Sequence, residues 1–270
     1  MKTVLQHSVN AIPGSIRRAI KYVPGLAATQ RWLIRHYLEG QTFVHKLNAG
    51  PAAGLRFEVT LPQDKAIWAG TYEHEFTSTI VAHVRKGDIC YDVGGYRGFM
   101  CGAMAMAGAS RVFVFEPLSI NRMALARLLE LNPALPLSVL PYAISDNDGS
   151  GQFKVMPDLS MGRIADNSTS PETMDLEPVT VRKIDSLVQT HEILPAHVVK
   201  IDVEGAELAV LKGSLHVVRA CRPKIFIEAH SATLERACSE LLAPFRYKIR
   251  RMERYLGTEN SVRHLICLPC

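Results

Sequence analysis

Four acidic residues of this chain stand where predicted strands end: Asp92, Glu116, Asp202 and Glu228. In an open α/β sheet the carboxyl ends of the strands meet at one edge, and ligands bind there. Carboxylates that lie close together repel one another and shift each other's pKa values. The grouping therefore predicts that a cation, a metal ion or hydroxyl donors lie between these side chains.

A glycine-rich turn begins at the first of these acids, in the run Asp92-Val93-Gly94-Gly95-Tyr96-Arg97-Gly98. An acid, a glycine turn and a helix in this order are typical of sites for the adenosine end of a cofactor. The dinucleotide fingerprint G-x-G-x-x-G requires glycines where this chain has Tyr96 and Phe99. Asp92 repels a phosphate, whereas it suits the ammonium or sulfonium of S-adenosylmethionine. The turn therefore favours that cofactor, and an NAD(P)-dependent oxidoreductase is the less favoured alternative.

The second acid, Glu116, stands at the end of the next strand, immediately before Pro117. A carboxylate at this place suits the two ribose hydroxyls of an adenosine, which it can bridge. Asp92 and Glu116, as a pair around the glycine turn, therefore predict cofactor binding.

The remaining acids suggest a proton acceptor. If a sulfonium cofactor donates its methyl group to an oxygen, the reaction is an in-line displacement, and the protein then has to position the acceptor and remove its proton. The candidates for this proton acceptor are Asp202, Glu204 and His230. Lys200 stands inside a strand beside these acids, and we expect it to form an ion pair. A divalent metal held by Asp202, Glu204 and Glu228 is an alternative that we do not favour.

A strand–helix–strand rhythm predicts a mostly parallel sheet in an α/β fold with helices on both faces. Strands are expected at residues 89–93, 112–115, 137–144, 198–202 and 224–228, followed by an antiparallel pair at 247–252 and 264–268. The helices expected beside the candidate site span residues 99–107 and 204–211. This order places the four acids at one edge of the sheet.

The chain is predicted to have two parts. Residues 1–69 form an N-terminal extension with helices at 12–40 and a hairpin at 42–61, and residues 70–270 form the cofactor-binding domain. Residues 145–180 break the rhythm, and we interpret them as an insertion over the site. The basic N-terminal segment is expected to pack on its own domain, with peripheral contact to an anionic membrane or a homodimer contact as alternatives.

The composition of the 270 residues is that of a soluble globular protein, with 47% hydrophobic and 21% charged residues. No apolar run approaches the roughly 20 residues of a membrane span. The six cysteines do not form a dense disulfide framework, which favours a cytoplasmic setting, and Cys267-Leu268-Pro269-Cys270 lacks the second pair that a zinc site needs. The net charge of +5 is concentrated at the two ends of the chain, which argues against a nucleic-acid groove through the acidic middle.

Four segments resemble the FkbM family of S-adenosylmethionine-dependent methyltransferases in their order and spacing. They are the turn at 92–98, Val114-Phe115-Glu116-Pro117, Ala143-Ile144-Ser145-Asp146 with Gly149, and Lys200-Ile201-Asp202-Val203-Glu204-Gly205-Ala206-Glu207 with Leu211-Lys212-Gly213. The last segment is the most specific, and the resemblance runs from about residue 70 to residue 230. It implies a Rossmann-like class I methyltransferase fold with a seven-stranded sheet. It also implies methyl transfer to a hydroxyl of a small acceptor such as a sugar or polyketide.

The resemblance implies roles for individual residues around S-adenosylmethionine. At the methionine end these are Asp92, Gly94, Gly95 and Gly98, with Tyr72 and Glu73 closing over them. At the ribose they are Glu116 and Pro117, and at the adenine Tyr142 and Ala143. Asp202 would lie near the transferable methyl group.

One departure from the family pattern lies in the glycine turn. Members of the family carry Ala-Asn where this chain has Gly95-Tyr96, so a small amide is missing. This departure motivates a second hypothesis from another class, a cofactor-binding or scaffold protein of the same fold that has little or no turnover.

Overall fold

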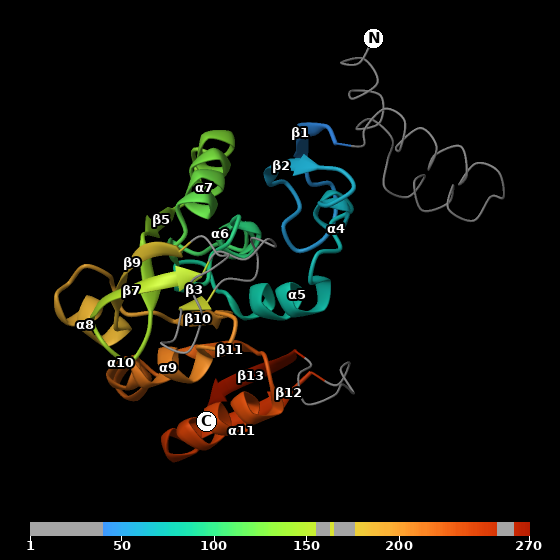
Figure 1. Ribbon diagram of the computed structural model, residues 1–270. Coiled ribbons are helices and arrows are strands. Elements are labelled where there is room, and N and C mark those ends of the chain that lie inside the picture. Colours follow the sequence, from blue (N-terminus) through green and yellow to red (C-terminus); the bar gives the residue numbers. More distant parts are fainter. Residues whose placement is uncertain (1–39, 155–162, 165–175, 253–261) are drawn as a thin grey trace, which may run out of the picture. The chain divides into compact units, whose positions relative to one another are not determined.

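The computed structural model describes residues 40–154, 163–164, 176–252 and 262–270 (Figure 1). The chain divides into two compact units, Met1–Glu75 and Phe76–Cys270. The helices expected at 12–40 lie outside the described residues, and the domain boundary at 69/70 stays a prediction. No helix in the described part of the chain is long and apolar enough to cross a bilayer.

The described part of the first unit contains a hairpin and a short helix. Strands β1 (Thr42–Lys46) and β2 (Arg56–Thr60) pair antiparallel, which confirms the predicted hairpin, and α4 (Lys65–Trp68) follows. Alternate residues of the second strand, Phe57 and Val59, are buried as the period of two requires.

The second unit is built on a seven-stranded sheet in the order β12-β13-β11-β10-β3-β4-β5. Its strands are β3 (Ile89–Val93), β4 (Arg111–Phe115), β5 (Leu137–Leu140), β10 (Val198–Ile201), β11 (Lys224–Ala229), β12 (Tyr247–Arg251) and β13 (Arg263–Pro269). The five strands from β11 to β5 are parallel, whereas β13 and β12 are antiparallel to their neighbours. The predicted mostly parallel sheet with a closing antiparallel pair is therefore confirmed.

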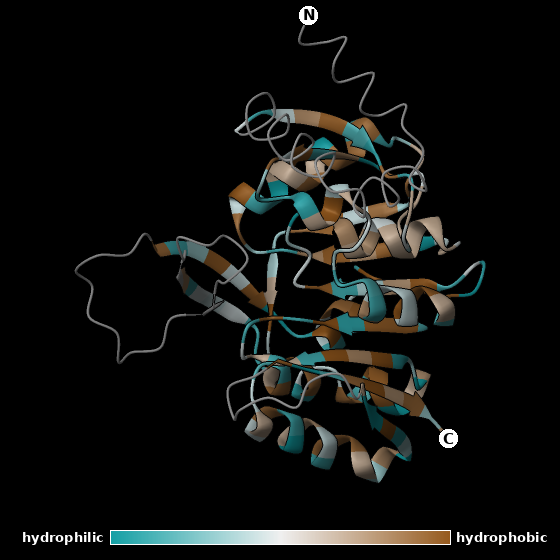
Figure 2. Ribbon diagram, turned by 90° about the vertical axis from the view of Figure 1, so that its right-hand side faces the viewer, coloured by the Kyte–Doolittle hydropathy of each residue, from teal (hydrophilic) through white to brown (hydrophobic). Residues whose placement is uncertain are grey.

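Helices cover the sheet (Figures 1 and 2). They are α5 (His74–His83), α6 (Phe99–Met106), α7 (Ser119–Leu131), α8 (Ile184–Gln189), α9 (Glu207–Lys212), α10 (Leu215–Cys221) and α11 (Ala232–Leu242), with the 3₁₀ turn η1 (Ala243–Phe245). Buried residues of α8 to α11 pack with Val93 and Ile201 in one core cluster. On the opposite face, Asp92 lies against the backbone of Cys101 in α6. The alternation of side chains along a strand thus separates an apolar face from a face that carries charge.

Two predicted elements were wrong in detail. The strand expected at 137–144 is split at Pro141, because proline cannot donate to a strand ladder, and β6 (Tyr142–Ile144) leaves the main sheet. The helix expected from residue 204 begins only at Glu207, because Glu204 (φ 52°) and Gly205 (φ 106°) form a left-handed turn before it.

The insertion carries strands of its own. Strand β6 joins β7 (Gly149–Lys154), β8 (Arg163–Ile164) and β9 (Leu176–Arg182) in a second sheet of order β6-β9-β7-β8. Most of the polar stretch at 157–178 lies outside the described residues.

Packing accounts for the glycines of the turn. Gly94 (φ 83°) and Gly98 (φ 91°) are left-handed, a conformation that favours glycine. A Cβ atom on Gly94 would lie 1.8 Å from the carbonyl oxygen of Asp202, and one on Gly98 would lie 2.5 Å from Leu128 Cδ2. The turn therefore needs glycine because of its own neighbours, whether or not a cofactor approaches it.

We expect Gly98→Ala to destabilise the protein more than Gly87→Ala. Both glycines are left-handed, but a Cβ on Gly87 would meet no atom within 4 Å. Both variants carry a backbone cost of about 1–2 kcal/mol, and Gly98→Ala adds an overpacking cost of about 1–3 kcal/mol. The measurement is the free energy of unfolding in urea; equal losses for the two variants would contradict the packing argument.

Candidate functional site

An open cavity lies at the carboxyl ends of β3 and β4. Its wall is completed by β6, by Phe153 of β7 and by the turn that follows β10. The wall is mixed, with carboxylates on one part and apolar side chains such as Leu118 and Ile144 on another. This is the edge of the sheet at which α/β proteins bind ligands.

The structure brings only part of the predicted site to the cavity. The predicted residues that line it are Gly94, Glu116, Pro117, Tyr142, Ala143, Asp202 and Glu204. Those that do not line it are Asp92, Gly95, Gly98 and His230. Tyr72 and Glu73 belong to the first unit, and their part in the site stays a prediction.

Glu116 closes one end of the cavity and is only 4% exposed. Its Oε1 accepts hydrogen bonds from Leu118 N at 2.9 Å and Asn121 Nδ2 at 3.2 Å, and its Oε2 accepts one from Tyr96 N at 2.8 Å. Burial raises the pKa of Glu116, and these hydrogen bonds oppose the rise. A carboxylate has about four acceptor positions, so three described donors leave Oε2 able to accept one more hydrogen bond.

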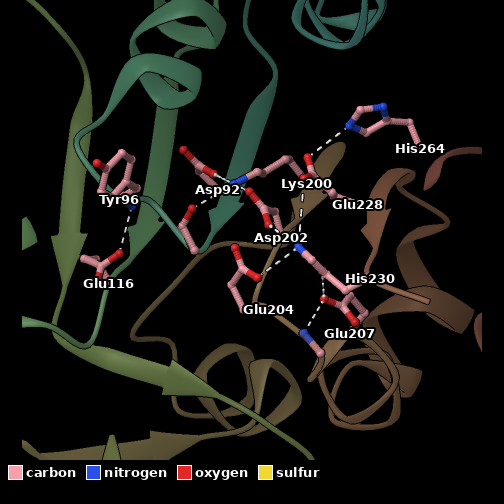
Figure 3. Close-up of polar contacts among 12 residues, drawn as sticks. Asp92, Tyr96, Glu116, Lys200, Asp202, Glu204, Glu207, Glu228, His230 and His264 are labelled. Atoms are coloured by element: carbon pink, nitrogen blue, oxygen red, sulfur yellow. Dashed lines mark hydrogen bonds and ion pairs between the residues drawn. The ribbon is translucent and has the colours of Figure 1, made fainter. Parts of the chain in front are cut away.

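Tyr96 joins the glycine turn to the end of β4 through its backbone. It has a left-handed conformation (φ 45°), which is rare for a bulky residue, and it lines the cavity. The hydrogen bond from its N–H to Glu116 holds the turn in this shape (Figure 3). The missing amide of the sequence pattern therefore does not break the link between turn and carboxylate.

Lys200 forms the charged centre behind the cavity. Its Nζ lies 3.0 Å from Asp92 Oδ1 and 3.3 Å from Asp202 Oδ2, and it donates to Gly94 O at 2.7 Å. Lys200 and Asp92 are opposite each other in the register of β10 and β3, which confirms the expected ion pair. Asp92 is fully buried, and burial raises its pKa although Lys200 opposes the rise. Asp92 therefore acts on the cavity through Lys200 and the turn.

His230 is held between carboxylates (Figure 3). Its Nδ1 lies 2.7 Å from Oε1 of the buried Glu207, and its Nε2 lies 3.2 Å from Glu204 Oε2. Burial alone lowers the pKa of His230, but the neighbouring carboxylates outweigh it and raise the pKa to about 9. Both ring nitrogens are thus engaged by acids rather than directed into the cavity.

The pKa values of the surrounding carboxyls follow from burial and from their neighbours. Burial is the main cause that raises the pKa of Asp202 and of Glu204. Lys200 and His230 oppose the rise at Asp202, and His230 opposes it at Glu204. The pKa of Glu228 is lowered although burial acts upward, because His264 Nε2 lies 3.0 Å from Glu228 Oε2. The cluster therefore contains carboxylates with unlike proton affinities side by side.

Sequence reasoning missed three residues that hold the site: Asn121, Glu207 and His264. Glu207 lies at the end of the most specific segment, so its position in that run was the one available signal. Its Oε1 also accepts from Gly205 N at 2.8 Å, which fixes the turn before α9. His264 reaches Glu228 from the antiparallel β13, a strand pairing that the sequence placed but whose register it did not define.

The strand order and the closing antiparallel pair define a class I methyltransferase fold. The family model described as "Methyltransferase FkbM domain" matches residues 92–261, and the chain belongs to this family. The protein is therefore a methyltransferase. The family assignment confirms the resemblance and overturns the oxidoreductase alternative.

Individual relatives of known function or structure share only modest sequence identity with this chain. The chain is 29% identical over 178 residues to the hexuronic acid methyltransferase AglP of Haloferax volcanii, a match that covers 63% of this chain and 68% of that protein. Among solved structures, the FkbM methyltransferase of Methylobacillus flagellatus matches 70% of this chain and 50% of its own, with 18% identity and a TM-score of 0.48. A putative rRNA methylase of Clostridium thermocellum matches 72% of this chain and 93% of its own, with 10% identity and a TM-score of 0.48.

We expect Lys200→Met to cost more stability than Asp92→Asn. Loss of the ammonium strands the buried Asp92, a situation that typically costs about 3–5 kcal/mol, whereas Lys200 in the Asp92→Asn variant keeps Asp202 and Gly94 O as partners. The variant that carries both Lys200→Met and Asp92→Asn should lose less stability than Lys200→Met alone. The measurement is a double-variant cycle of urea unfolding, and strictly additive losses would contradict the ion pair.

Proposed function

We propose that the protein transfers a methyl group from S-adenosylmethionine to a hydroxyl of a small sugar-type metabolite. Family membership supports methyl transfer. The observation that carries the rest is the cavity itself, which has Glu116 at one end and the carboxylates of Asp202 and Glu204 on its wall.

The residues of the cavity fit the cofactor. Glu116 Oε2 has one acceptor position left for a ribose hydroxyl, so we propose a single direct hydrogen bond there rather than a bridge to both hydroxyls. Tyr142 and Ala143, on the wall beside Leu118, are proposed to flank the adenine. This places the nucleoside between β4 and β6.

The methionine end is proposed to lie toward Gly94 and Asp202. Asp202 lines the cavity, and its side chain is 24% exposed, so it can face a cation there. Asp92 supports this end indirectly, because it is buried behind the turn and holds Lys200. Tyr72 and Glu73 remain candidates for closure over the methionine part.

The proton of the acceptor hydroxyl is proposed to pass to Glu204. S-adenosylmethionine, when bound, supplies an activated methyl group, so this chain has to position the acceptor and take up the proton. Glu204 lines the cavity from the strained turn after β10, with a side chain 26% exposed. Asp202 is the next candidate. His230 lies outside the cavity wall with both nitrogens against carboxylates, so we propose that it positions Glu204 rather than accepts the proton.

The acceptor is proposed to be a small molecule and not a nucleic acid. The relative AglP is named as a hexuronic acid methyltransferase, which supports a sugar or sugar acid. The six free cysteines, four of them buried, support a cytoplasmic place of action. A homodimer and a membrane contact of the N-terminal segment stay open alternatives.

We expect Glu116→Gln to weaken binding of S-adenosylhomocysteine by at least about tenfold. The amide would lose the charge-assisted bond to the ribose, worth about 1.5–3 kcal/mol, and would direct an NH₂ group toward existing donors. Glu130→Gln on the exposed surface of α7 is the matched control and should leave the affinity unchanged. Isothermal titration calorimetry is the measurement; no binding by the wild type would sink the cofactor assignment.

We expect Glu204→Gln to lower turnover by about 10²–10⁴-fold, the range for loss of a general base. The affinity for S-adenosylhomocysteine should change far less. Turnover is measured with radiolabelled S-adenosylmethionine on a panel of sugars and uronic acid glycosides, with Glu130→Gln as control. Cofactor binding by the wild type without transfer to any of these acceptors would favour the scaffold hypothesis, and full activity of Glu204→Gln would reject the assigned role.

A further inference from the structure

Three side chains beside the cavity form a ligand set that methyl transfer by itself does not require. Asp202, Glu228 and His230 bring one ligand atom each to within 4.8 Å of one another. His230 Nε2 lies 3.8 Å from Asp202 Oδ1 and 3.9 Å from Glu228 Oε1 (Figure 3). Carboxylate oxygen and imidazole nitrogen are common ligands of divalent ions in proteins.

The orientation of His230 is fixed from behind. Its Nδ1 lies 2.7 Å from Oε1 of Glu207, whose side chain is fully buried. A histidine that ligates a metal through one nitrogen nearly always donates the other N–H to a carboxylate or carbonyl, which sets the tautomer and the ring plane. Glu207 supplies this contact, and Nε2 then faces Glu204 at 3.2 Å, Asp202 at 3.8 Å and Glu228 at 3.9 Å. An ion bound to Nε2 would replace its contact with Glu204.

The two carboxylates are held in the same way. Glu228 Oε2 contacts His264 Nε2 at 3.0 Å, and the His264 ring stacks on Phe76 with a centroid distance of 4.1 Å. Asp202 Oδ2 contacts Lys200 Nζ at 3.3 Å. In each residue one polar atom is therefore occupied by a buried partner, and the other faces the same point as His230 Nε2.

The charge of the cluster also favours a further cation. The carboxylates joined by these contacts are Asp92, Asp202, Glu204, Glu207 and Glu228, and the groups that can carry positive charge are Lys200, His230 and His264. The acids outnumber the cations even if both imidazoles are protonated. A divalent ion bound to His230 Nε2 in place of its proton would reduce this excess of negative charge. Such an excess is costly in a partly buried site.

We propose that Asp202, Glu228 and His230 bind a divalent first-row transition-metal ion such as Mn²⁺ beside the cavity. For Zn²⁺, bonds of about 2.0–2.2 Å at tetrahedral angles place ligand atoms about 3.4 Å apart. The separations of 3.8 and 3.9 Å from Nε2 to Asp202 Oδ1 and Glu228 Oε1 would have to close by about half an ångström. The nitrogen ligand favours a transition-metal ion over Mg²⁺ and Ca²⁺, which prefer oxygen, and the two carboxylate ligands also suit Mn²⁺. Three protein ligands leave coordination positions open, and an ion there would acidify a hydroxyl bound to it.

The test is calorimetric titration of the full chain with MnCl₂, without cofactor or acceptor, so its result does not depend on the proposed methyl transfer. We expect one ion per chain. Glu228→Gln and His230→Gln should each weaken binding at least about tenfold, and Glu207→Gln about 10–100-fold, as for other partners of ligating histidines. Glu130→Gln is the control for acidic surface groups. Mn²⁺ is used because Zn²⁺ also binds cysteine sulfur, and Cys270 is exposed.

A second measurement needs no variant. Pulsed electron paramagnetic resonance of the Mn²⁺-loaded wild type should show coupling to one directly bound imidazole nitrogen. No Mn²⁺ binding at millimolar concentration, binding unchanged by both ligand substitutions, or bound Mn²⁺ without nitrogen coupling would each overturn the proposal.

Discussion

A single buried ammonium organises the centre of the second unit. Lys200 is 3% exposed and contacts the carboxylate of Asp92 on the neighbouring β3, the carboxylate of Asp202 just beyond its own strand, and the carbonyl of Gly94. Because a buried charge is tolerated only when it is paired, these contacts fix one another. The shape of the glycine turn and the direction of Asp202 thus depend on the same group. The cavity and the acid cluster behind it are therefore parts of one electrostatic unit.

Much of the fold could be predicted because local patterns determine it. Short apolar runs separated by helical stretches predicted the strands of the main sheet and that most of them are parallel. The errors lie where backbone chemistry interrupts a pattern. Pro141 ends the ladder of β5, and the left-handed Glu204 delays the start of α9.

The sequence predicted at which edge of the sheet the candidate site lies, but not which side chains line the cavity. The four strand-end acids do come to one region, yet which of them faces the cavity depends on side-chain alternation and on tertiary packing. Asp92 lies within β3 and is turned toward α6, whereas Asp202 lies just beyond β10 and is turned toward the cavity. Asn121, Glu207 and His264 act through contacts between distant segments, and no spacing in one sequence encodes such contacts.

Two strands of the second sheet contribute different parts of the cavity wall. Tyr142 and Ala143 are fixed by parallel pairing of β6 with β9, close to the main sheet, and Phe153 reaches the wall from β7 farther out. The segment between β7 and β9 can therefore change in length and composition while the pairing of β6 persists. If the nucleoside lies against Tyr142 and Ala143 as proposed, substitutions in the insertion could change which acceptor is bound without disturbing the pairing of β6 with β9.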